Sequence, residues 1–420
     1  MKPAPPSPPD SEPALTPALS QTVTGKSGSL LQNVLSLPRT VWLLAAISLV
    51  NDAASDMIYP LVPLYLASVL MAGPKALGII EGIAEGVSSL IKLAAGVLAD
   101  RTGKTRAWVI GGYAIAGFAR PLIGIATSWV GVLACRFADR IGKGLRTAPR
   151  DALISHSIRA DQRGVAFGFH RAMDNLGAVI GPLMAAALLA AGVGLRNVFL
   201  LAVIPAIVVL ALAFAVPEPE SPVRAKREAF RWTFSGLPAP FRRYLLVLAL
   251  FTLGNSSNMF LLLRANELGA SATRVTLMWA LFSGVAAVLS TPLSAMSDRY
   301  GRARVLGIAW LAYAAAYLMI GLLPGADWAL WVAFAGYGVV TAALEGTEKA
   351  LVADLVPQER SGTAFGWYNL VSGILLLPAS LIFGWIWSSV SPFAAFAFGA
   401  ACAFAAALLL RAWVVPEAQA

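Results

Sequence analysis

Several carboxylates stand inside apolar stretches of the sequence, where they could carry protons. Asp52 and Asp56 are four residues apart and therefore share one face of a helix. A carboxylate with little water around it holds a proton more readily than one in water, which suits a proton carrier. The alternative is that both aspartates form structural salt bridges to the stretch 164–190. Asn51, next to Asp52, is a candidate contact for a bound solute.

Glu85 is a further proton-carrier candidate. It follows Glu81 by four residues and precedes Lys92 by seven, so the three side chains form one stripe on a helix over 76–98. An ionisable group at the centre of a membrane costs about 2.5–3.5 kcal/mol on insertion scales, so this stripe is expected to face protein or a cavity. We expect Glu85 to be the deepest of the three and Glu81 to lie at the outer mouth.

The stretch 129–148 carries an unusual number of charges. Arg136 and Arg140 share a helix face, and Asp139 is in reach of either Arg136 or Lys143. At cavity depth Arg140 suits an anionic solute, because guanidinium binds a carboxylate in a two-pronged geometry. The alternative is that Arg140, Lys143 and Arg146 line the cytoplasmic gate.

Another group of polar residues stands near the start of the stretch 164–190. Arg171 precedes Asp174 by three residues and Asn175 by four, which predicts an ion pair between Arg171 and Asp174. His170 is predicted to lie at the membrane interface. Asp174 joins the proton-coupling candidates, and Arg171 and Asn175 join the candidates for a solute cavity.

The second half of the chain has fewer charges and more neutral polar groups. Asn255 and Asn258 offer donors and acceptors without the cost of a charge, and Tyr368 could stack on a solute. Glu345 is the last cavity candidate, although its spacing from Lys349 also predicts a simple ion pair. We therefore expect the titratable chemistry in the first half and the determinants of specificity in the second.

The elements that hold these residues are predicted from composition. The chain of 420 residues is 58% hydrophobic and 13% charged, whereas a soluble protein carries roughly 25% charged residues. A helix that crosses a bilayer needs about 20 apolar residues. Twelve stretches qualify: 41–69, 76–98, 107–126, 129–148, 164–190, 197–216, 243–266, 273–295, 304–323, 329–355, 362–387 and 392–412. The sequence thus predicts an all-α membrane protein with twelve transmembrane helices.

The net charge of +10 indicates orientation rather than nucleic-acid binding. Lys and Arg concentrate in the connections on one side, and the positive-inside rule places that side, with both termini, in the cytoplasm. Residues 1–36 are rich in Pro, Ser and Ala and are predicted to be a disordered cytoplasmic tail. Two bundles of six helices, 37–216 and 243–413, flank a central cytoplasmic loop over 217–242, and 414–420 form a second cytoplasmic tail.

A charged island occurs twice at an offset of 198 residues. GVLADRTGKTR covers 96–106, and SAMSDRYGRAR covers 294–304. The candidate motif residues are Gly96, Asp100, Arg101, Gly103, Lys104 and Arg106 in the first copy and Asp298, Arg299, Gly301 and Arg304 in the second. RGVAFGF and SGTAFGW, which begin at residues 163 and 361, repeat at the same offset. A constant offset indicates internal duplication into two pseudo-symmetric bundles, with a site between them near the membrane midplane.

These features resemble the major facilitator superfamily (MFS). The resemblance rests on the two six-helix halves, the long central loop and GxLADRxGKxR between the second and third helices, and it covers nearly all of the chain after the tail. It implies a secondary active transporter that alternates between inward-open and outward-open forms. Arg136 resembles an arginine that members often hold in the cavity and tie to proton coupling. Gly177, Gly181 and Pro182 resemble the GxxxGP core of drug/proton antiporters.

The resemblance extends to a bacterial permease subgroup through RFADRIGKGLRTAPRDALI over 136–154. It implies a monomeric, multi-pass protein of the bacterial inner membrane whose partners are lipid, protons and a small solute. The repeated islands are expected to form a cytoplasmic gate, or to act only as a topology signal. No P-loop, HExxH or CxxC occurs, so we expect no enzyme, ATP-driven pump, cofactor or metal site.

Three functions remain open at this point. The first is a proton-coupled transporter that exports a small organic solute by antiport. The second is a proton symporter that imports an anionic nutrient or a carboxylate-type siderophore. Arg136, Arg140 and Arg171 favour this function, because they could bind an anion. The third is a membrane sensor that transports nothing.

Overall fold

The structure, a computed structural model, describes residues 30–102, 104–159, 162–217, 236–325, 328–357 and 360–414. For residues 30, 31, 33, 93, 96–102, 163, 164, 361 and 362 it describes the backbone alone. Gly103 and most of the predicted tails and central loop lie outside the described residues. The chain divides into two units: residues 1–36, whose described part forms the short helix α1 (Leu30–Leu35), and residues 37–420.

All described elements of the second unit are helical, and they follow the twelve predicted spans. The first six spans are α2 (Arg39–Ile58) with α3 (Leu61–Ser68), α4 (Pro74–Thr102), α5 (Thr105–Leu122) with a 3-10 turn (Ile123–Ile125), α6 (Trp129–His156), α7 (Arg163–Ala190), and α8 (Leu195–Leu201) with α9 (Val203–Phe214). The other six are α10 (Ala239–Gly254) with α11 (Met259–Glu267), α12 (Ala272–Tyr300), α13 (Arg302–Leu322), α14 (Trp328–Asp354), α15 (Ser361–Ser389), and α16 (Pro392–Leu409) with a π-helical end (Leu410–Val414).

One boundary differs clearly from the prediction. The charged stretch after residue 148 was expected to be a connection, but α6 continues through Pro149 to His156. The side chains there have hydrogen-bond partners that offset the cost of burying a charge. Arg150 Nη1, for example, donates to Ser48 Oγ of α2 at 3.2 Å. Charge in the sequence therefore marked contacts between helices rather than the end of a helix.

Two spans are broken in the middle. Pro60 separates α2 from α3, because proline has no N–H to continue the helical ladder. The break between α10 and α11 spans Asn255 to Asn258, whose side chains compete with the helix for backbone bonds. Ser257 Oγ, for example, accepts from the backbone N–H of Met259 at 3.3 Å. Both breaks place polar groups inside the bundle.

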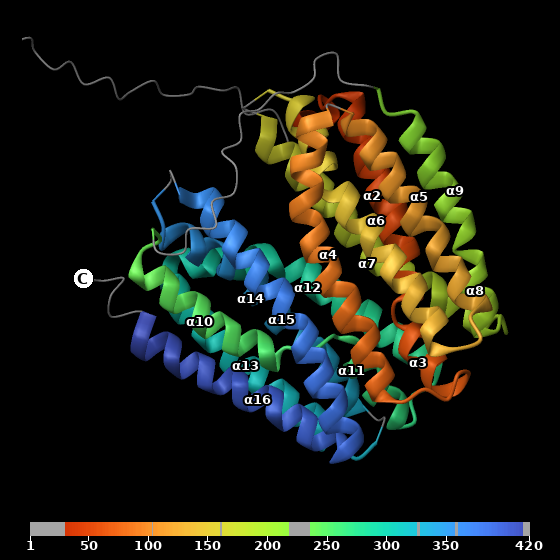
Figure 1. Cartoon of the computed structure of the whole chain (residues 1–420), viewed down its shortest axis with the longest axis vertical. Helices are drawn as coiled ribbons and strands as arrows, with labels where there is room; N and C mark the ends of the chain where they lie inside the picture. Colours follow the sequence, from red (N-terminus) through yellow and green to blue (C-terminus); the bar gives the residue numbers. More distant parts are fainter. Residues whose placement is uncertain are drawn as a thin grey trace, which may run out of the picture. The chain divides into compact units, whose positions relative to one another are not determined.

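The two six-helix bundles pack against each other mainly through two pairs of helices, α4 with α15 and α7 with α12 (Figure 1). Glycine allows the close approach of α4 to α15, because a Cβ on Gly82 would lie 2.9 Å from the Leu377 carbonyl oxygen. Gly78, one turn earlier, faces the Ser380 backbone in the same way. Tight backbone packing thus joins the halves near the start of α4.

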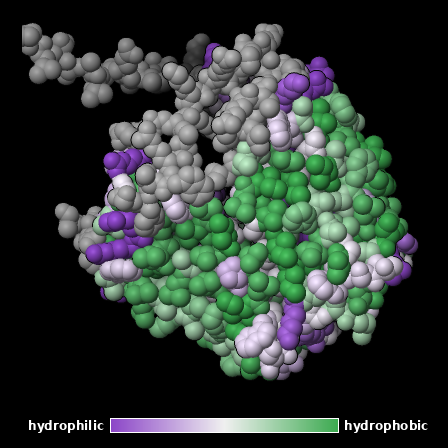
Figure 2. Space-filling model, in the orientation of Figure 1, coloured by the Kyte–Doolittle hydropathy of each residue, from purple (hydrophilic) through white to green (hydrophobic). Residues whose placement is uncertain are grey.

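The surface of the helices is apolar, as the bilayer requires. Figure 2 shows a face that is mostly hydrophobic, with hydrophilic residues gathered at its margins. In water so large an apolar surface would promote association. Ten of the spans are long and apolar enough by themselves to cross a membrane in the described part of the chain. The remaining two, α4 and α6, carry most of the charged residues that make up the site described below.

Candidate functional site

A cluster of charged side chains is buried in the first bundle, where α4, α5 and α6 meet. Its three arginines and three carboxylates are Arg120, Arg136, Arg140, Glu81, Glu85 and Asp139. Arg136 donates to Glu81 Oε1 from Nη2 at 2.6 Å and from Nε at 3.0 Å, and both residues are 1% exposed. Glu81 is therefore buried with a counter-ion, and its predicted place at the outer mouth stays a prediction.

Asp139 connects the three arginines of this charge cluster. Arg120 Nε donates to its Oδ1 at 2.9 Å, while Arg140 and Arg136 lie 3.3 Å and 3.5 Å from its Oδ2. Spacing predicted Arg136 as one possible partner, but it missed Arg120 of α5. A lone cation in the middle of an apolar stretch, directly before Pro121, was the available signal. Arg120 also donates to Asn51 Oδ1 at 3.0 Å.

Glu85 lies at the edge of the charge cluster, with 27% of its side chain exposed. Its Oε1 is 2.8 Å from Arg140 Nε, at an angle that makes the contact an ion pair rather than a hydrogen bond. Glu81, not Glu85, is thus the more deeply buried of the two. Because each arginine faces at least one carboxylate, the charge cluster is balanced within itself, and Arg140 is already paired before any anionic solute arrives.

Asp52 and Asp56 stand outside these ion pairs. Asp52 Oδ1 accepts from Asn51 Nδ2 at 2.8 Å, and Asp56 Oδ1 accepts from the indole N–H of Trp279 in α12 at 3.2 Å. Within the described ranges neither carboxylate forms an ion pair. The salt bridges to 164–190, considered as an alternative, are therefore not formed.

Arg171 bridges the two bundles instead of pairing within its helix. Its Nη2 lies 2.6 Å from Glu345 Oε1 of α14, and the two side chains are 53% and 46% exposed. The predicted pairs of Arg171 with Asp174 and of Glu345 with Lys349 are consequently replaced by one pair between the halves. Spacing along a helix could not reveal this partner, because the two residues belong to different helices.

His170 and Asp174 form a buried contact between α7 and α2. His170 is 4% exposed, its Nε2 lies 2.9 Å from Ser48 Oγ, and its Nδ1 lies 3.6 Å from Asp174 Oδ2. Ser48 thus offers His170 a partner inside the bundle, and its predicted position at the depth of the membrane interface stays a prediction. Asp174 Oδ1 is buried without a hydrogen-bond partner. Asn175, the next residue, is partly buried.

The break between α10 and α11 is held by tyrosines of the second bundle. Tyr313 donates its hydroxyl to Asn255 Oδ1 at 3.1 Å, and Tyr337 donates to Asn258 Oδ1 at 2.8 Å. Ser257, between the two asparagines, donates to Glu81 Oε2 of the first bundle at 3.1 Å. The break therefore connects the charge cluster of one half with the aromatic core of the other.

Tyr368 does not present a free hydroxyl to a solute. It donates to Glu348 Oε2 of α14 at 2.8 Å and is 7% exposed. A separate row of stacked rings crosses between the halves. The ring centroid of Trp279 lies 5.1 Å from that of Tyr59 and 4.5 Å from that of Phe282. Sequence reasoning missed Trp279, because a tryptophan in an apolar helix gives no sign of its partner.

The repeated charged island is described most fully in its second copy. Gly301 has φ +88° and turns the chain from α12 into α13, a conformation that favours glycine. Arg302 occupies the repeat position of Lys104. Its Nη2 lies 3.2 Å from Asp298 Oδ1, and its Nη1 lies 2.7 Å from Asp354 Oδ1. These contacts join the ends of α12, α13 and α14. Arg299 and Arg304 are exposed.

In the first copy, Gly103 and the side chains of Gly96, Asp100 and Arg101 lie outside the described residues. Lys104 is exposed, and Arg106 donates from Nη2 to the Phe214 carbonyl oxygen at 2.6 Å. The island thus contacts the end of α9 in its own half.

The GxxxGP segment of α7 is a packing surface. A Cβ on Gly177 would lie 2.6 Å from the Leu49 carbonyl oxygen, and one on Gly181 would clash with the Ala53 carbonyl oxygen. The two glycines therefore let α7 lie directly against α2, which carries Asp52 and Asp56.

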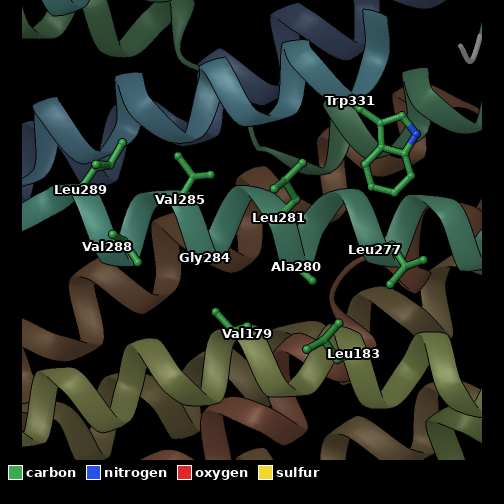
Figure 3. A pocket seen from close by; sticks show the side chains of 10 residues that line it. All are labelled: Val179, Leu183, Leu277, Ala280, Leu281, Gly284, Val285, Val288, Leu289 and Trp331. Carbon is green, nitrogen blue, oxygen red and sulfur yellow. The ribbon is translucent and has the colours of Figure 1, made fainter. Parts of the chain in front are cut away.

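An apolar groove of about 720 Å³ opens between α7 and α12 (Figure 3). Val179 and Leu183 of α7 lie opposite Gly284 and Ala280 of α12, and Trp331 of α14 completes the lining. The groove has no charged lining residue, so it is distinct from the sites of titratable chemistry. In the described part of the chain, no group of His, Cys, Asp and Glu is arranged to hold a metal ion.

Comparison with known proteins agrees with this architecture. An MFS-type transporter of Methanocaldococcus jannaschii is 33% identical over 386 residues, which cover 90% of this chain and 96% of the relative. The multidrug resistance protein MdtG of Escherichia coli is 29% identical over 274 residues, or 61% of this chain and 65% of MdtG.

The fold is also that of solved transporters. The nucleoside transporter NupG superposes with a TM-score of 0.76 at 12% identity, covering 89% of this chain and 99% of NupG, a likeness of fold alone. The profile of the Major Facilitator Superfamily matches residues 44–263 and 244–420. With its twelve spans in two halves, the chain is a multi-pass membrane protein that belongs to the Major Facilitator Superfamily.

Proposed function

We propose that this transporter couples the export of a small organic solute to protons by alternating access. The observation that carries the proposal is the environment of Asp56, a carboxylate inside a membrane-spanning helix that forms no ion pair in the described structure. Without a fixed counter-ion, such a group can gain and lose a proton during a cycle. Glu81 and Asp139, in contrast, are each held by arginine.

The geometry ranks the proton-coupling candidates. Asp52, Asp56 and Asp174 are the carriers we propose, because none of them contacts an arginine or lysine in the described ion pairs. Glu85 and Arg136 are proposed as fixed members of the charge cluster, where each has an opposite charge within 3 Å. Arg140, predicted from sequence as a cavity residue, is likewise proposed as a fixed member of the charge cluster. The solute is proposed to contact the remaining polar candidates: Asn51, Arg171, Asn175, Asn255, Asn258, Glu345 and Tyr368.

We further propose that this form is inward-open, with the charged islands at the cytoplasmic gate and both termini in the cytoplasm. The halves are in tight backbone contact near the start of α4, at Gly78 and Gly82. Closer to the islands, the bridging pair Arg171 and Glu345 is about half exposed. Closure at one end and access at the other support this assignment. A monomer in the inner membrane of a bacterium is part of the same proposal.

Export is favoured over import by two observations. MdtG, a multidrug resistance protein, is 29% identical over 61% of this chain. In addition, Arg136 and Arg140 are neutralised inside the charge cluster, which makes them poor ligands for an anionic solute. The symport alternative depends on Arg171, whose guanidinium is half exposed.

Metabolite profiling of a deletion strain, in cells and in medium, tests the direction. Export predicts that one or a few small organic compounds accumulate inside the deletion cells and decline outside. Import predicts the opposite sign for an anionic compound, and loss of its uptake in Arg171→Gln. A sensor that transports nothing predicts no flux of the identified compound in proteoliposomes that contain the purified protein. Either of the last two results contradicts the proposal.

A further inference from the structure

Two hydrogen bonds between side chains cross from the first bundle to the second near their closed ends. Trp279 Nε1 donates to Asp56 Oδ1 at 3.2 Å, and Ser257 Oγ donates to Glu81 Oε2 at 3.1 Å. In each bond a carboxylate of the first half accepts from a neutral donor of the second. Any change in the charge of these carboxylates therefore acts directly on the contact between the halves.

The two carboxylates differ in what fixes their charge. Glu81 has a fixed counter-ion, because Arg136 Nη2 lies 2.6 Å from its Oε1. Asp56 has no ion pair in the described structure; the charges that act on it across space are Asp52 on its own helix, Lys143 on α6 and Arg120 on α5. Asp56 is thus the member of the two bonds whose charge can change.

Helix α7, which packs along α2, adds no charge beside Asp56. It faces this part of α2 with Gly181, whereas its Asp174 lies further along, at the level of Ser48 and Asp52. The charge state of Asp56 is therefore not dictated by a fixed ion on α7.

Trp279 is held in place to make its bond. It is 6% exposed, and its ring stacks on Tyr59 of the first half at 5.1 Å and on Phe282 of its own helix at 4.5 Å. Burial and two ring contacts restrict the rotation of the indole and keep its N–H directed at one place. The donor is consequently preorganised for a carboxylate at the position of Asp56.

We propose that Trp279 is a positioning residue that couples the protonation state of Asp56 to closure of the outer side of the transporter. An N–H bond to an ionised carboxylate is roughly twice as strong as one to a neutral acceptor. The indole N–H therefore stabilises the ionised carboxylate more than the neutral one, and by linkage a proton on Asp56 weakens this contact of the closed form. A proton that binds Asp56 while the outer side is open is released from the carboxyl to cavity water after that side closes. This inference rests on the proposed proton coupling.

A single cysteine at the closed contact tests the inference without a known substrate. Both native cysteines, Cys135 and Cys402, are free thiols and are replaced by alanine. The reporter is Ser380→Cys, since Ser380 is 2% exposed and its backbone faces Gly78. Intact cells are treated with a membrane-impermeant maleimide at acid and neutral pH, and labelling is normalised to denatured protein at each pH.

In the reporter protein, acid pH is expected to raise the labelling rate about tenfold, because protonation of Asp56 weakens the bond that keeps the outer side closed. Trp279→Phe keeps the aromatic ring and removes the donor, so it should label at the fast rate at both pH values. Asp56→Asn should also remove the pH dependence, and it serves as a second variant should Trp279→Phe fold poorly.

Trp387→Phe is the matched control. The Trp387 indole donates to Glu267 at the same 3.2 Å and is 5% exposed, but both partners belong to the second half. It should leave the rate and its pH dependence unchanged. The inference is overturned if labelling of the reporter protein does not respond to pH, if Trp279→Phe keeps the response, or if Trp387→Phe loses it. Failure of the proposed function would appear separately, as export by the unmodified protein that a protonophore does not slow.

Discussion

At the scale of single residues, the protein separates charges that are fixed from charges that can change. Arg136 and Glu81 are 1% exposed and bound to each other by two hydrogen bonds, so neither can lose its charge without leaving the other uncompensated. Asp56 accepts only from a neutral indole within the described structure. Burial alone does not make a carboxylate a proton carrier; the absence of a fixed counter-ion does.

Arg136→Gln should therefore be strongly destabilising. It leaves Glu81 as an unpaired buried charge, at a cost of about 3–5 kcal/mol in the free energy of unfolding. The double variant Arg136→Gln/Glu81→Gln should recover part of this loss, because no unpaired charge remains. Thermal unfolding of the purified protein measures both.

Arg171→Gln is the matched control for this prediction. It also removes one partner of a 2.6 Å ion pair, but that pair is half exposed and contributes only about 0–1 kcal/mol. Equal losses of thermal stability in Arg136→Gln and Arg171→Gln would contradict the account of the charge cluster.

At the scale of elements, glycines decide where helices touch, and polar residues decide which helices touch. Gly177 and Gly181 bring α7 against α2, and Gly82 brings α4 against α15. The ion pairs then connect different helices, as Arg120 of α5 does with Asp139 of α6. These contacts position Asp56 and Trp279 on opposite sides of the boundary between the halves.

Gly181→Ala should separate α2 from α7. Its Cβ would overlap the Ala53 carbonyl oxygen, and such overpacking costs about 1–3 kcal/mol. Gly168→Ala, on the same helix with no atom within 4 Å of the added Cβ, should leave stability unchanged or slightly raise it. Thermal unfolding compares the two variants. An equally stable Gly181→Ala protein would argue against the direct packing of α7 on α2.

Arg302→Gln should loosen the ends of α12, α13 and α14, because Arg302 contacts Asp298, Asp354 and the Ala350 carbonyl oxygen. We expect slower export with the same order of preference among solutes, since these residues belong to the proposed gate and not to the cavity. Competition between solutes in everted vesicles measures the preference. A changed order would place Arg302 in the solute site.

The sequence was sufficient for the fold because apolar runs of membrane length are visible without any partner. The repeat at 198 residues likewise predicted two similar halves. Partner choice was not visible, since spacing reports only neighbours on one helix. It predicted Arg171 with Asp174, whereas Arg171 pairs with Glu345, a residue 174 positions away. Trp279 and Asp56 are 223 positions apart, and one is largely apolar while the other is charged. Nothing in the sequence therefore indicates that they are partners.

At the scale of the whole molecule, the two halves divide the work that alternating access requires. The first holds the charge cluster and the carboxylates without counter-ions, and the second holds the broken span 255–258 and its tyrosines. The bonds of Asp56 and Glu81 to Trp279 and Ser257 connect the two sets. In the proposed mechanism, a proton on Asp56 shifts the balance between two arrangements of the halves through this connection.

The most direct test of proton-coupled export is to follow solute and proton movement together in proteoliposomes, once profiling has identified the solute. The unmodified protein should move protons in the direction opposite to the solute, and an imposed proton gradient should drive the solute against its own gradient. Asp56→Asn should still exchange solute across the membrane but move no protons with it. Solute movement by the unmodified protein without any proton movement, or unchanged proton movement in Asp56→Asn, would contradict the account.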